Sequence, residues 1–552
     1  MALIDTKVTT TDGVVGGVRG RRTRRGTISW RGIPYAAPPV GRGRFDAPQR
    51  VTPWNGVRWC TAFGDAAVQD KLLTATGPGR FQPVSEDCLT LNVFSPETES
   101  TTPRPVMVFI HGGAYILGTA ATPLYDGTHL ARSQDVIVVT IQYRFGPFGM
   151  LDFSGYSTPE RHFDENPGLK DHIAALHWVQ RNIGAFGGDP DNVTIFGESA
   201  GGSSVLMMLA APASRGLFAR GIAESPAADL TISKDSAAVF ADEYLRLLAD
   251  PARRRAGAAA DEQREPITPA EAARLLDGAS PTQLHKAGMR LMKFARNAPT
   301  PIEPVPFGPV YGGESLPYSP VEAARKGQTA AVPLIIGTNR DEGLLFDKFW
   351  NMLPDPEQTL LAVEDNAARD AIMNSYAGGA ADRVRLAADG IFWAPVTGFA
   401  DVYRAIAPTY VYRFDFHTKA LAKVGIGATH ATELFAVFGA YRTPTFAGLA
   451  AGDWRAAGAM IEQVQSRWGD FARGGEPGDW PRYTKEHREV LILDRRVRVE
   501  SDPDAARREA WDRGRALVLM TGGDDTEAPA PADLTDSTPA GVLLPERTTP
   551  TD

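Results

Sequence analysis

The segment Thr194–Gly202, TIFGESAGG, carries the strongest indication of the fold of this chain. A short run of β-forming residues ends in the pattern G-x-S-x-G, and small residues typical of the start of a helix follow it. Glycines on both sides of Ser199 leave room for a tight turn from strand to helix, which lifts the serine hydroxyl clear of its neighbours. One match to so short a pattern carries little weight in a chain of 552 residues, so its meaning depends on the rest of the sequence.

A second turn, upstream of the serine, offers the groups that a nucleophile would need. The segment Pro105–Tyr115, PVMVFIHGGAY, reads as an apolar strand that ends in a His-Gly-Gly turn. Attack on a carbonyl places negative charge on its oxygen, and that charge requires hydrogen-bond donors already in position. We expect the backbone N–H groups of Gly113, Ala114 and Ala200 to form this oxyanion hole. An ordinary strand-ending turn is the alternative, and the serine turn favours the first interpretation.

A nucleophilic serine also needs a base, and the base needs an acid that orients it. In proteins with this type of serine turn, the acid and then the histidine follow the serine along the chain. The strand-like segment Val332–Gly343, VPLIIGTNRDEG, ends in Asp341 and Glu342. Spacing does not choose between the two carboxylates, and a surface acidic turn is the alternative reading of this motif.

Four of the nine histidines lie near or after the candidate acid. His417 ends a strand-like segment and His430 follows the glycine-containing loop that continues from it, so either could reach the serine. His285 lies in a charged helical stretch before the acid, and His487 lies in the polar sequence KEHRE. We expect these last two to be packing or solvated residues, and spacing leaves His417 and His430 as alternatives.

Apolar runs such as MVFI, DVIVVTIQY, NVTIF and PLIIG alternate with helical stretches along the chain. This alternation predicts a mostly parallel sheet covered by helices, which is an α/β fold. The segment 166–183, NPGLKDHIAALHWVQRNI, has apolar residues at helical spacing and predicts a helix. The segment from about 233 to 292 is rich in Ala, Arg, Asp and Glu and predicts helices packed beside the sheet.

These segments together resemble the type-B carboxylesterases, the family that includes cholinesterases and bacterial para-nitrobenzyl esterases. The resemblance extends to about Trp511, and its matching blocks are WRGIPYAAPPVGRGRF, SEDCLTLNVF, PVMVFIHGGAY, NPGLKDHIAALHWVQRNIGAFGGDPDNVTIFGESAGG, VPLIIGTNRDEG and HATELFAVFG. It implies one α/β-hydrolase domain over residues 1–521, with the helical excursion of 233–292 beside an active-site gorge. Residues 522–552, rich in Pro, Thr and Asp, predict a disordered acidic tail.

The resemblance also implies roles that spacing left open. The acid is the glutamate of the D-E-G turn, Glu342, and Asp341 becomes a turn or ion-pair residue. The base is the histidine that opens the H-x-x-E-L block, His430. Ester hydrolysis then proceeds through an acyl-enzyme on Ser199, with no cofactor. The sequence also contains no H-E-x-x-H pair and no C-x-x-C cluster, so it offers no recognisable metal motif.

Two residues beside this machinery have supporting roles under the resemblance. Glu198 resembles a family glutamate that lines the site, and a helix N-terminal carboxylate favoured by the dipole is the alternative. Ser225 matches a supporting serine in the family's Q-S-G block, although Glu224 and Pro226 replace the usual flanking residues.

The only two cysteines, Cys60 and Cys88, fall where the family closes a disulfide loop. The opening sequence lacks the hydrophobic core of a secretory signal, so we expect a cytoplasmic protein, in which such a bond is usually reduced. We therefore expect the two cysteines to lie side by side and to oxidise after isolation. Secretion by an unrecognised route is the alternative.

Composition restricts the range of partners. A net charge of −8 gives no electrostatic reason to expect nucleic acid, and the arginine run of residues 21–25 is expected in a hairpin turn. No segment approaches the about 18 apolar residues of a membrane span. The expected partner is a small-molecule ester, and the sequence does not predict an oligomeric state.

Three functions remain compatible with these observations. The first is a carboxylesterase for short-chain or aryl esters, and the second is a hydrolase of a related acyl bond, such as a carbamate, amide or polyester, with the same triad. The third is a binding protein with an idle site. Choline esters are disfavoured because the loop from Cys60 to Cys88 has only Phe63 and Phe81 as aromatic residues, and no tryptophan to hold a quaternary ammonium.

Overall fold

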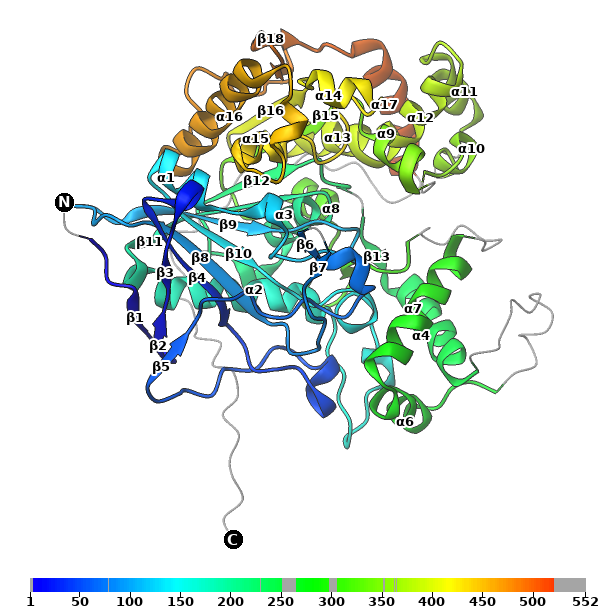
Figure 1. Ribbon diagram of the computed structural model, residues 1–552. Coiled ribbons are helices and arrows are strands. Elements are labelled where there is room, and N and C mark those ends of the chain that lie inside the picture. The colour runs from blue at the N-terminus through cyan, green and yellow to red at the C-terminus, as the bar shows by residue number, and fades with distance from the viewer. Residues whose placement is uncertain are drawn as a thin grey trace.

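The computed structural model describes residues 3–520, apart from 78, 229, 251–264, 297–304, 351–352, 362 and 364. The tail predicted for 522–552 lies outside the described residues. A large twisted sheet runs through the molecule, and helices lie on both of its faces (Figure 1).

This sheet has eleven strands in the spatial order β18-β17-β16-β15-β12-β11-β9-β10-β8-β4-β3. Neighbouring strands run parallel from β17 across to β10, and antiparallel pairs occur at both edges. The mostly parallel sheet predicted from the sequence is therefore confirmed. In chain order the strands are β3 (Val18–Arg19), β4 (Thr27–Pro34), β8 (Thr90–Pro96), β9 (Arg104–Ile110), β10 (Ile137–Ile141), β11 (Gly188–Glu198), β12 (Arg220–Glu224), β15 (Leu334–Asn339), β16 (Thr409–Phe414), β17 (Glu489–Leu493) and β18 (Arg498–Ser501).

The central strands are apolar on both faces because each face packs against helices. Along β9, Val106 and Val108 belong to one hydrophobic cluster, whereas Met107 and Phe109 belong to another. The first cluster includes buried residues of α2 and α3, and the second includes those of α1, α15 and α16. The sheet thus separates two cores, and the side chains of one strand alternate between them.

The helices that cover the sheet come from all parts of the chain. The helix predicted for 166–183 is confirmed as α2. The helices are α1 (Thr128–Gln134), α2 (Pro167–Asn182), α3 (Ala200–Ala210), α4 (Lys234–Ala249), α6 (Pro269–Gly278), α7 (Pro281–Arg296), α8 (Pro320–Arg325), α9 (Gly343–Leu345), α10 (Pro356–Thr359), α11 (Asn366–Asn374), α12 (Ala380–Ala388), α13 (Ala394–Tyr403), α14 (Lys419–Lys423), α15 (Leu434–Val437), α16 (Trp454–Gly474) and α17 (Ala505–Met520). Two π-helical turns, η9 (Phe346–Trp350) and η10 (Asp389–Trp393), adjoin α9 and α13.

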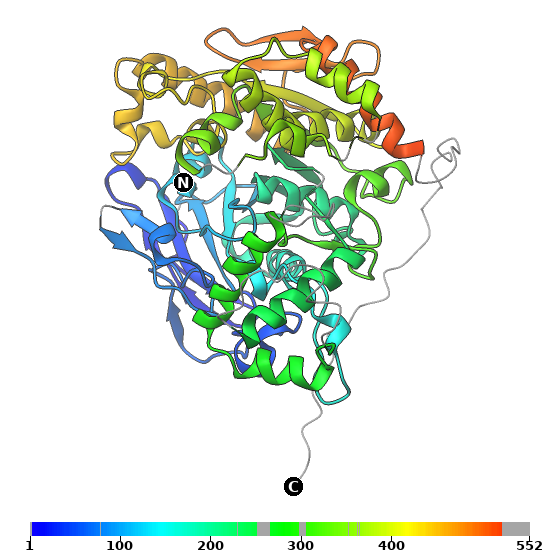
Figure 2. The same cartoon turned by 90° about the vertical axis from the view of Figure 1, so that its right-hand side faces the viewer.

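Smaller elements surround this framework. Three short sheets consist of β1 (Lys7–Thr10), β2 (Gly13–Gly16) and β5 (Val57–Trp59), of β6 (Ala75–Gly77) and β7 (Arg80–Phe81), and of β13 (Ile232–Ser233) and β14 (Val310–Tyr311). The excursion predicted for about 233–292 contains α4, α6 and α7, which stand together on one side of the molecule (Figure 2). The arginine run lies in the turn between β3 and β4, around the short helix η1 (Arg22–Arg24).

None of the helices among the described residues is long and apolar enough to span a membrane.

Candidate active site

Ser199 lies at the turn between β11 and α3 in a strained backbone conformation. Its φ and ψ are 58° and −124°, a region that residues with a side chain rarely adopt. The turn is held from both sides, because Ser199 N–H donates to the Glu224 carbonyl at 2.9 Å and Ser203 N–H donates to the Ser199 carbonyl at 2.8 Å. The Ser199 side chain is half-buried, so it remains accessible from the site.

The glycine that follows the serine permits this close packing. A Cβ atom added at Gly201 would lie 1.9 Å from the carbonyl oxygen of Ile110, the last residue of β9. Strand β9 and helix α3 can therefore approach only because position 201 has no side chain. This contact places the turn after β9 beside Ser199.

That turn has an unusual backbone conformation and lies against Ser199. Gly113, Ala114 and Tyr115 have positive φ values of 119°, 52° and 56° in succession. A Cβ atom added at Gly112 would lie 2.9 Å from Ser199 Cβ, so the turn passes directly against the serine. The N–H groups of Gly113, Ala114 and Ala200 donate to no other group in the described part of the chain. The backbone N–H groups of these three residues thus remain unpaired among the described residues.

The structure brings His430 together with Glu342. His430 Nδ1 lies 2.6 Å from Glu342 Oε2, and both side chains are buried. The other oxygen of this carboxylate accepts from the backbone N–H of Asn339 at 2.6 Å. Asp341 faces elsewhere, since it pairs with Arg340 at 2.8 Å and accepts from the N–H of Ala428 at 3.2 Å. Glu342 is therefore the carboxylate that orients this imidazole.

The second nitrogen of His430 faces Glu198. Nε2 lies 3.0 Å from Glu198 Oε1, but neither atom makes a hydrogen bond within the described residues, so none joins Nε2 to Ser199 Oγ. Burial alone would lower the pKa of His430, but Glu198 and Glu342 together outweigh burial and raise that pKa well above 6.5. The imidazole thus lies between two carboxylates that favour its charged form.

Two phenylalanines cover His430. The ring centroids of Phe346 and Phe392 lie 5.0 Å and 4.6 Å from that of the imidazole. Each phenylalanine comes from one of the two π-helical turns, η9 and η10. Such turns are rare in proteins and occur often at functional sites. Sequence reasoning missed both residues, because no local pattern marks a π-helical turn.

A buried polar layer supports the histidine from below. Asn339 Nδ2 donates to the Thr429 carbonyl at 2.8 Å and also bonds to Glu433 Oε2. Burial, and after it the charge of Glu198, raise the pKa of Glu433 well above its ordinary range. Sequence reasoning missed Asn339 and Glu433, although Glu433 is the glutamate of the H-x-x-E-L block that identified His430.

The remaining candidates lie at varying distances from this centre. Ser225 is fully buried, has a φ of 44°, and donates its N–H to the Gly337 carbonyl at 2.8 Å, while its Oγ makes no hydrogen bond among the described residues. His417 Nδ1 lies 3.3 Å from the Asp415 carbonyl, and neither Glu198 nor Glu342 contacts it. Of the two histidines that spacing left open, His430 is the one held by Glu342.

The sequence-based expectation for the two cysteines is a pair of adjacent thiols that oxidise only after isolation. Cys60 and Cys88 are both buried free thiols. Their surroundings differ: burial raises the pKa of Cys60 to about 11 with Arg58 as its charged neighbour, whereas Cys88 lies deeper, near Asp171 and Arg144. Burial likewise raises the pKa of Cys88 well above its ordinary value. Both thiols therefore resist ionisation, which disulfide formation requires.

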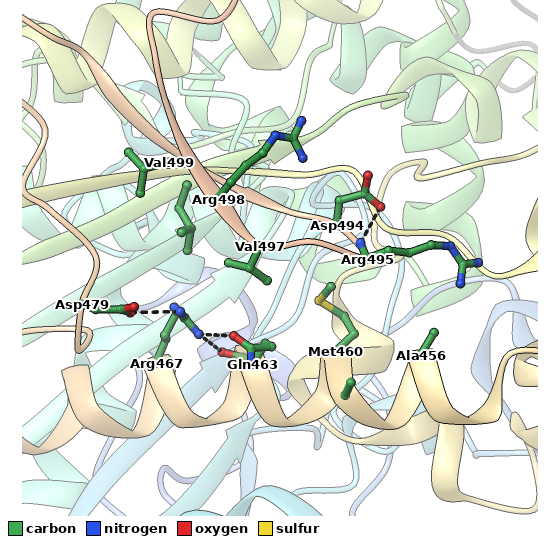
Figure 3. A pocket seen from close by; sticks show the side chains of 12 residues that line it. Ala456, Met460, Gln463, Arg467, Asp479, Asp494, Arg495, Val497, Arg498 and Val499 are labelled. Carbon is green, nitrogen blue, oxygen red and sulfur yellow. Dashed lines mark hydrogen bonds and ion pairs between the residues drawn. The ribbon is translucent and has the colours of Figure 1, made fainter.

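One cavity lies away from these residues. It has a volume of about 480 Å³ and lies between α16 and the β17–β18 hairpin (Figure 3). Arg467 on its wall is held by Asp479 at 3.0 Å and by Gln463 Oε1 at 2.6 Å. A cavity of about 220 Å³ does reach Glu342. Among the described residues no group of three or more His, Cys, Asp or Glu side chains is arranged to hold a metal ion.

Comparison with known proteins identifies the family of this chain. The family model of the carboxylesterase family matches residues 4–511. A para-nitrobenzyl esterase of Bacillus subtilis (strain 168) is 37% identical over 509 residues, which cover 90% of this chain and 96% of that protein. A liver carboxylesterase of Sus scrofa is 35% identical over 510 residues, which cover 82% of this chain and 83% of that protein.

Solved structures show the same relationship. A para-nitrobenzyl esterase structure superposes with a TM-score of 0.80 at 37% identity, covering 92% of this chain and 99% of that one. A carboxylesterase of Geobacillus stearothermophilus superposes with a TM-score of 0.75 at 32% identity, covering 92% of this chain and 100% of that one. With its sheet and its serine turn, the chain therefore belongs to the carboxylesterase family and is a carboxylic ester hydrolase of the α/β-hydrolase fold.

Proposed function

We propose that this protein hydrolyses small esters with short acyl chains or aryl groups through a triad of Ser199, His430 and Glu342. The observation that carries the proposal is the pair of Glu342 and His430 at 2.6 Å, beside a strained serine and unused N–H donors. The names of the relatives support the substrate class, since one is a para-nitrobenzyl esterase and another a liver carboxylesterase.

In the acylation half of the reaction, neutral His430 exchanges its contact with Glu198 for the hydroxyl of Ser199. Nε2 takes the hydroxyl proton while Oγ bonds to the ester carbonyl carbon, and the carbonyl oxygen becomes an oxyanion. The N–H groups of Gly113, Ala114 and Ala200 donate to this oxyanion. The tetrahedral intermediate then collapses, and the protonated His430 gives its proton to the departing alkoxide, which leaves as the alcohol.

In the deacylation half, the same groups act on water. His430 removes a proton from a water molecule, whose oxygen attacks the acyl carbon of the ester formed on Ser199. The oxyanion forms again at the same N–H groups, and its collapse returns the proton from His430 to Ser199 Oγ. The products are a carboxylic acid and the free enzyme. Throughout, Glu342 stabilises the cationic imidazole and does not itself need to take up a proton.

The test is hydrolysis of a para-nitrophenyl ester series, from acetate to long acyl chains, by the wild type and by Ser199→Ala. We expect turnover concentrated at short chains, and near-background turnover in the variant with unchanged folding. Labelling of the wild type by an organophosphate, absent in Ser199→Ala, checks that the serine is the nucleophile. Substantial esterase activity of Ser199→Ala would refute the assignment.

A pair of neighbouring acid substitutions tests the role of Glu342. Glu342→Gln is expected to lower kcat strongly, whereas Asp341→Asn is expected to leave kcat nearly unchanged, since Asp341 bonds to Arg340 and to the loop at Ala428. Equal losses in both variants would contradict the choice of Glu342. Turnover of carbamates or amides without turnover of matched esters would instead favour a related acyl bond as the substrate.

A further inference from the structure

Two glutamates lie side by side at the carboxyl ends of neighbouring strands. Glu198 of β11 and Glu224 of β12 are register partners in a parallel pair. Two residues earlier, Phe196 and Ile222 both pack in the hydrophobic cluster that includes α16. Because side chains alternate along a strand, both carboxyl groups lie on this same face. Their exposed fractions are only 3% and 0%, so neither carboxyl group is solvated.

Helix α16 closes over Glu224. Trp468 Nε1 donates to Glu224 Oε1 at 2.8 Å. The ring of Tyr412, on β16, packs against the ring of Trp468, with the centroids 5.5 Å apart. The Tyr412 ring also lies over Gly337, where an added Cβ would be 2.4 Å from it. Glu224 Oε2 makes no hydrogen bond among the described residues. One donor is too few for a buried anionic carboxylate, whose oxygens accept several hydrogen bonds.

The main chain of the same residue reaches the nucleophile. The carbonyl oxygen of Glu224 accepts the N–H of Ser199 at 2.9 Å. The side chain of Glu224 thus lies beside Glu198, which is 3.0 Å from His430 Nε2. The backbone of Glu224 meanwhile holds the turn at Ser199. Glu224 therefore contacts the turn at Ser199 and lies next to Glu198, the carboxylate that competes with Ser199 for His430.

We propose that Glu224 is a positioning residue that remains a neutral carboxylic acid, so that Glu198 is the only one of these two glutamates that presents a negative charge to His430. This inference rests on the proposed function above. If Glu224 were also ionised, its charge beside that of Glu198 would stabilise the imidazolium form of His430 further. Less of the neutral base would then be available to Ser199. With Glu224 neutral, the imidazolium is stabilised less, and His430 can lose its proton.

The electrostatic surroundings of Glu224 support a neutral form. Burial raises its pKa to about 8 against the hydrogen bond from Trp468, which lowers it, and the charge of Glu198 adds to the rise. The other titratable groups facing this position are Tyr412 from β16 and Glu433 from the turn before α15, and burial is the largest cause that raises the pKa of each. The neighbouring strand β15 contributes only Gly337 at the level of Glu224.

The first test compares pH profiles of kcat/KM for the wild type and Glu224→Gln. Glutamine has the shape of the neutral acid and keeps an oxygen for Trp468. We expect equal values within about twofold at pH 6.5, and an advantage of about two- to tenfold for Glu224→Gln at pH 9, since one nearby charge shifts a pKa by up to about one unit. In the wild type, ionisation of Glu224 should appear as a decline of kcat/KM at alkaline pH. Trp468→Phe should move this decline to higher pH, because it removes the hydrogen bond that lowers the pKa of Glu224.

The second test measures thermal unfolding and needs no catalysis. A carboxyl group with a raised folded-state pKa contributes stability that is complete below about pH 4.5 and is lost progressively up to about pH 8. In a Ser199→Ala background, the Tm difference between Glu224→Gln and the parent should therefore grow from pH 5 to pH 8 and then level off. Glu322→Gln, which removes an exposed carboxylate on α8, is the control and should show no such growth.

These readouts separate the possible failures. If Ser199 were not the nucleophile, the pH profiles would lose their meaning, but the growth of the Tm difference would still report a neutral Glu224. A constant Tm difference between pH 5 and pH 8 would overturn the proposal. A loss of activity in Glu224→Gln that is equal at all pH values would also overturn it, since that result indicates a merely structural role.

Discussion

His430 has a carboxylate at each ring nitrogen, Glu342 at Nδ1 and Glu198 at Nε2. Each carboxylate lies within 3.0 Å of a ring nitrogen, and nearby negative charge favours the imidazolium over the neutral imidazole. The same groups raise the pKa of His430 against the effect of burial. As an ion pair this arrangement stabilises the folded protein below pH 6.5, and the contribution is lost as the pH rises through the raised pKa. Catalysis requires the opposite form, the neutral base.

The pH dependence of hydrolysis follows from this conflict. We expect kcat/KM to rise with pH along a limb whose apparent pKa lies above 6.5, because His430 must lose a proton before it accepts one from Ser199. Glu198→Gln removes one of the two charges and should move this limb to lower pH, raising activity at pH 6. Asp341→Asn serves as the control and should leave the limb in place. A wild-type midpoint at or below pH 6.5 would contradict this reading of the site.

The turn that carries Ser199 depends on how closely α3 approaches β9. Glycine at position 201 allows the carbonyl oxygen of Ile110 to lie only 1.9 Å from where a Cβ would stand, and this approach also brings the turn at Gly112 against Ser199. A backbone carbonyl within a strand cannot move aside alone, because its neighbours in the sheet would have to move with it. The geometry of the turn is therefore a property of two elements together.

Gly201→Ala tests this dependence. Alanine ordinarily stabilises a helix relative to glycine by about 1 kcal/mol, but here the clash at 1.9 Å reverses the sign. We expect a net loss of about 1–3 kcal/mol or more in the free energy of unfolding, measured by urea denaturation, together with a loss of turnover. Gly184→Ala is the matched control, since an added Cβ there meets nothing within 4 Å. A stable and fully active Gly201→Ala variant would argue against the observed packing of α3.

At the scale of the whole molecule, buried polar links join segments that are far apart in the chain. Arg144 bonds bidentately to Asp171 of α2 at 2.7 Å and 2.8 Å, and its Nη1 donates to the Asp46 carbonyl at 2.9 Å. The side chains of Arg144 and Asp171 are exposed by only 3% and 0%. Such a pair is costly to break, because removal of one partner leaves the other charge buried without compensation.

Asp171→Asn should therefore lower the free energy of unfolding by about 3–5 kcal/mol, as measured by chemical denaturation. Asp135→Asn makes the same chemical change in the pair of Arg104 and Asp135, which has the same 2.7 Å separation, but Asp135 is 65% exposed. Water screens that pair, so we expect a loss of about 1 kcal/mol or less. Similar losses in both variants would show that burial of the Arg144 pair is less complete than observed.

Local patterns account for much of this protein. Some features depend only on the backbone conformation of a few consecutive residues: the serine turn, the His-Gly-Gly turn and the alternating strands and helices. Glycine, small residues and β-branched residues favour these conformations directly. The parallel sheet, helix α2 and the position of Ser199 at a strand-to-helix turn all agree with those predictions. The choices between Asp341 and Glu342, and between His417 and His430, needed the family resemblance, because spacing alone left them open.

Other features arise only when distant segments pack together. The hydrogen bond of Trp468 to Glu224 spans 244 residues of sequence, and the phenylalanine cover of His430 comes from two separate π-helical turns. The orientation of His430 Nε2 toward Glu198, and the separate surroundings of the thiols of Cys60 and Cys88, likewise depend on packing. Short-range patterns describe backbone turns and burial, whereas the meeting of side chains from different strands depends on register, twist and the room left by neighbours.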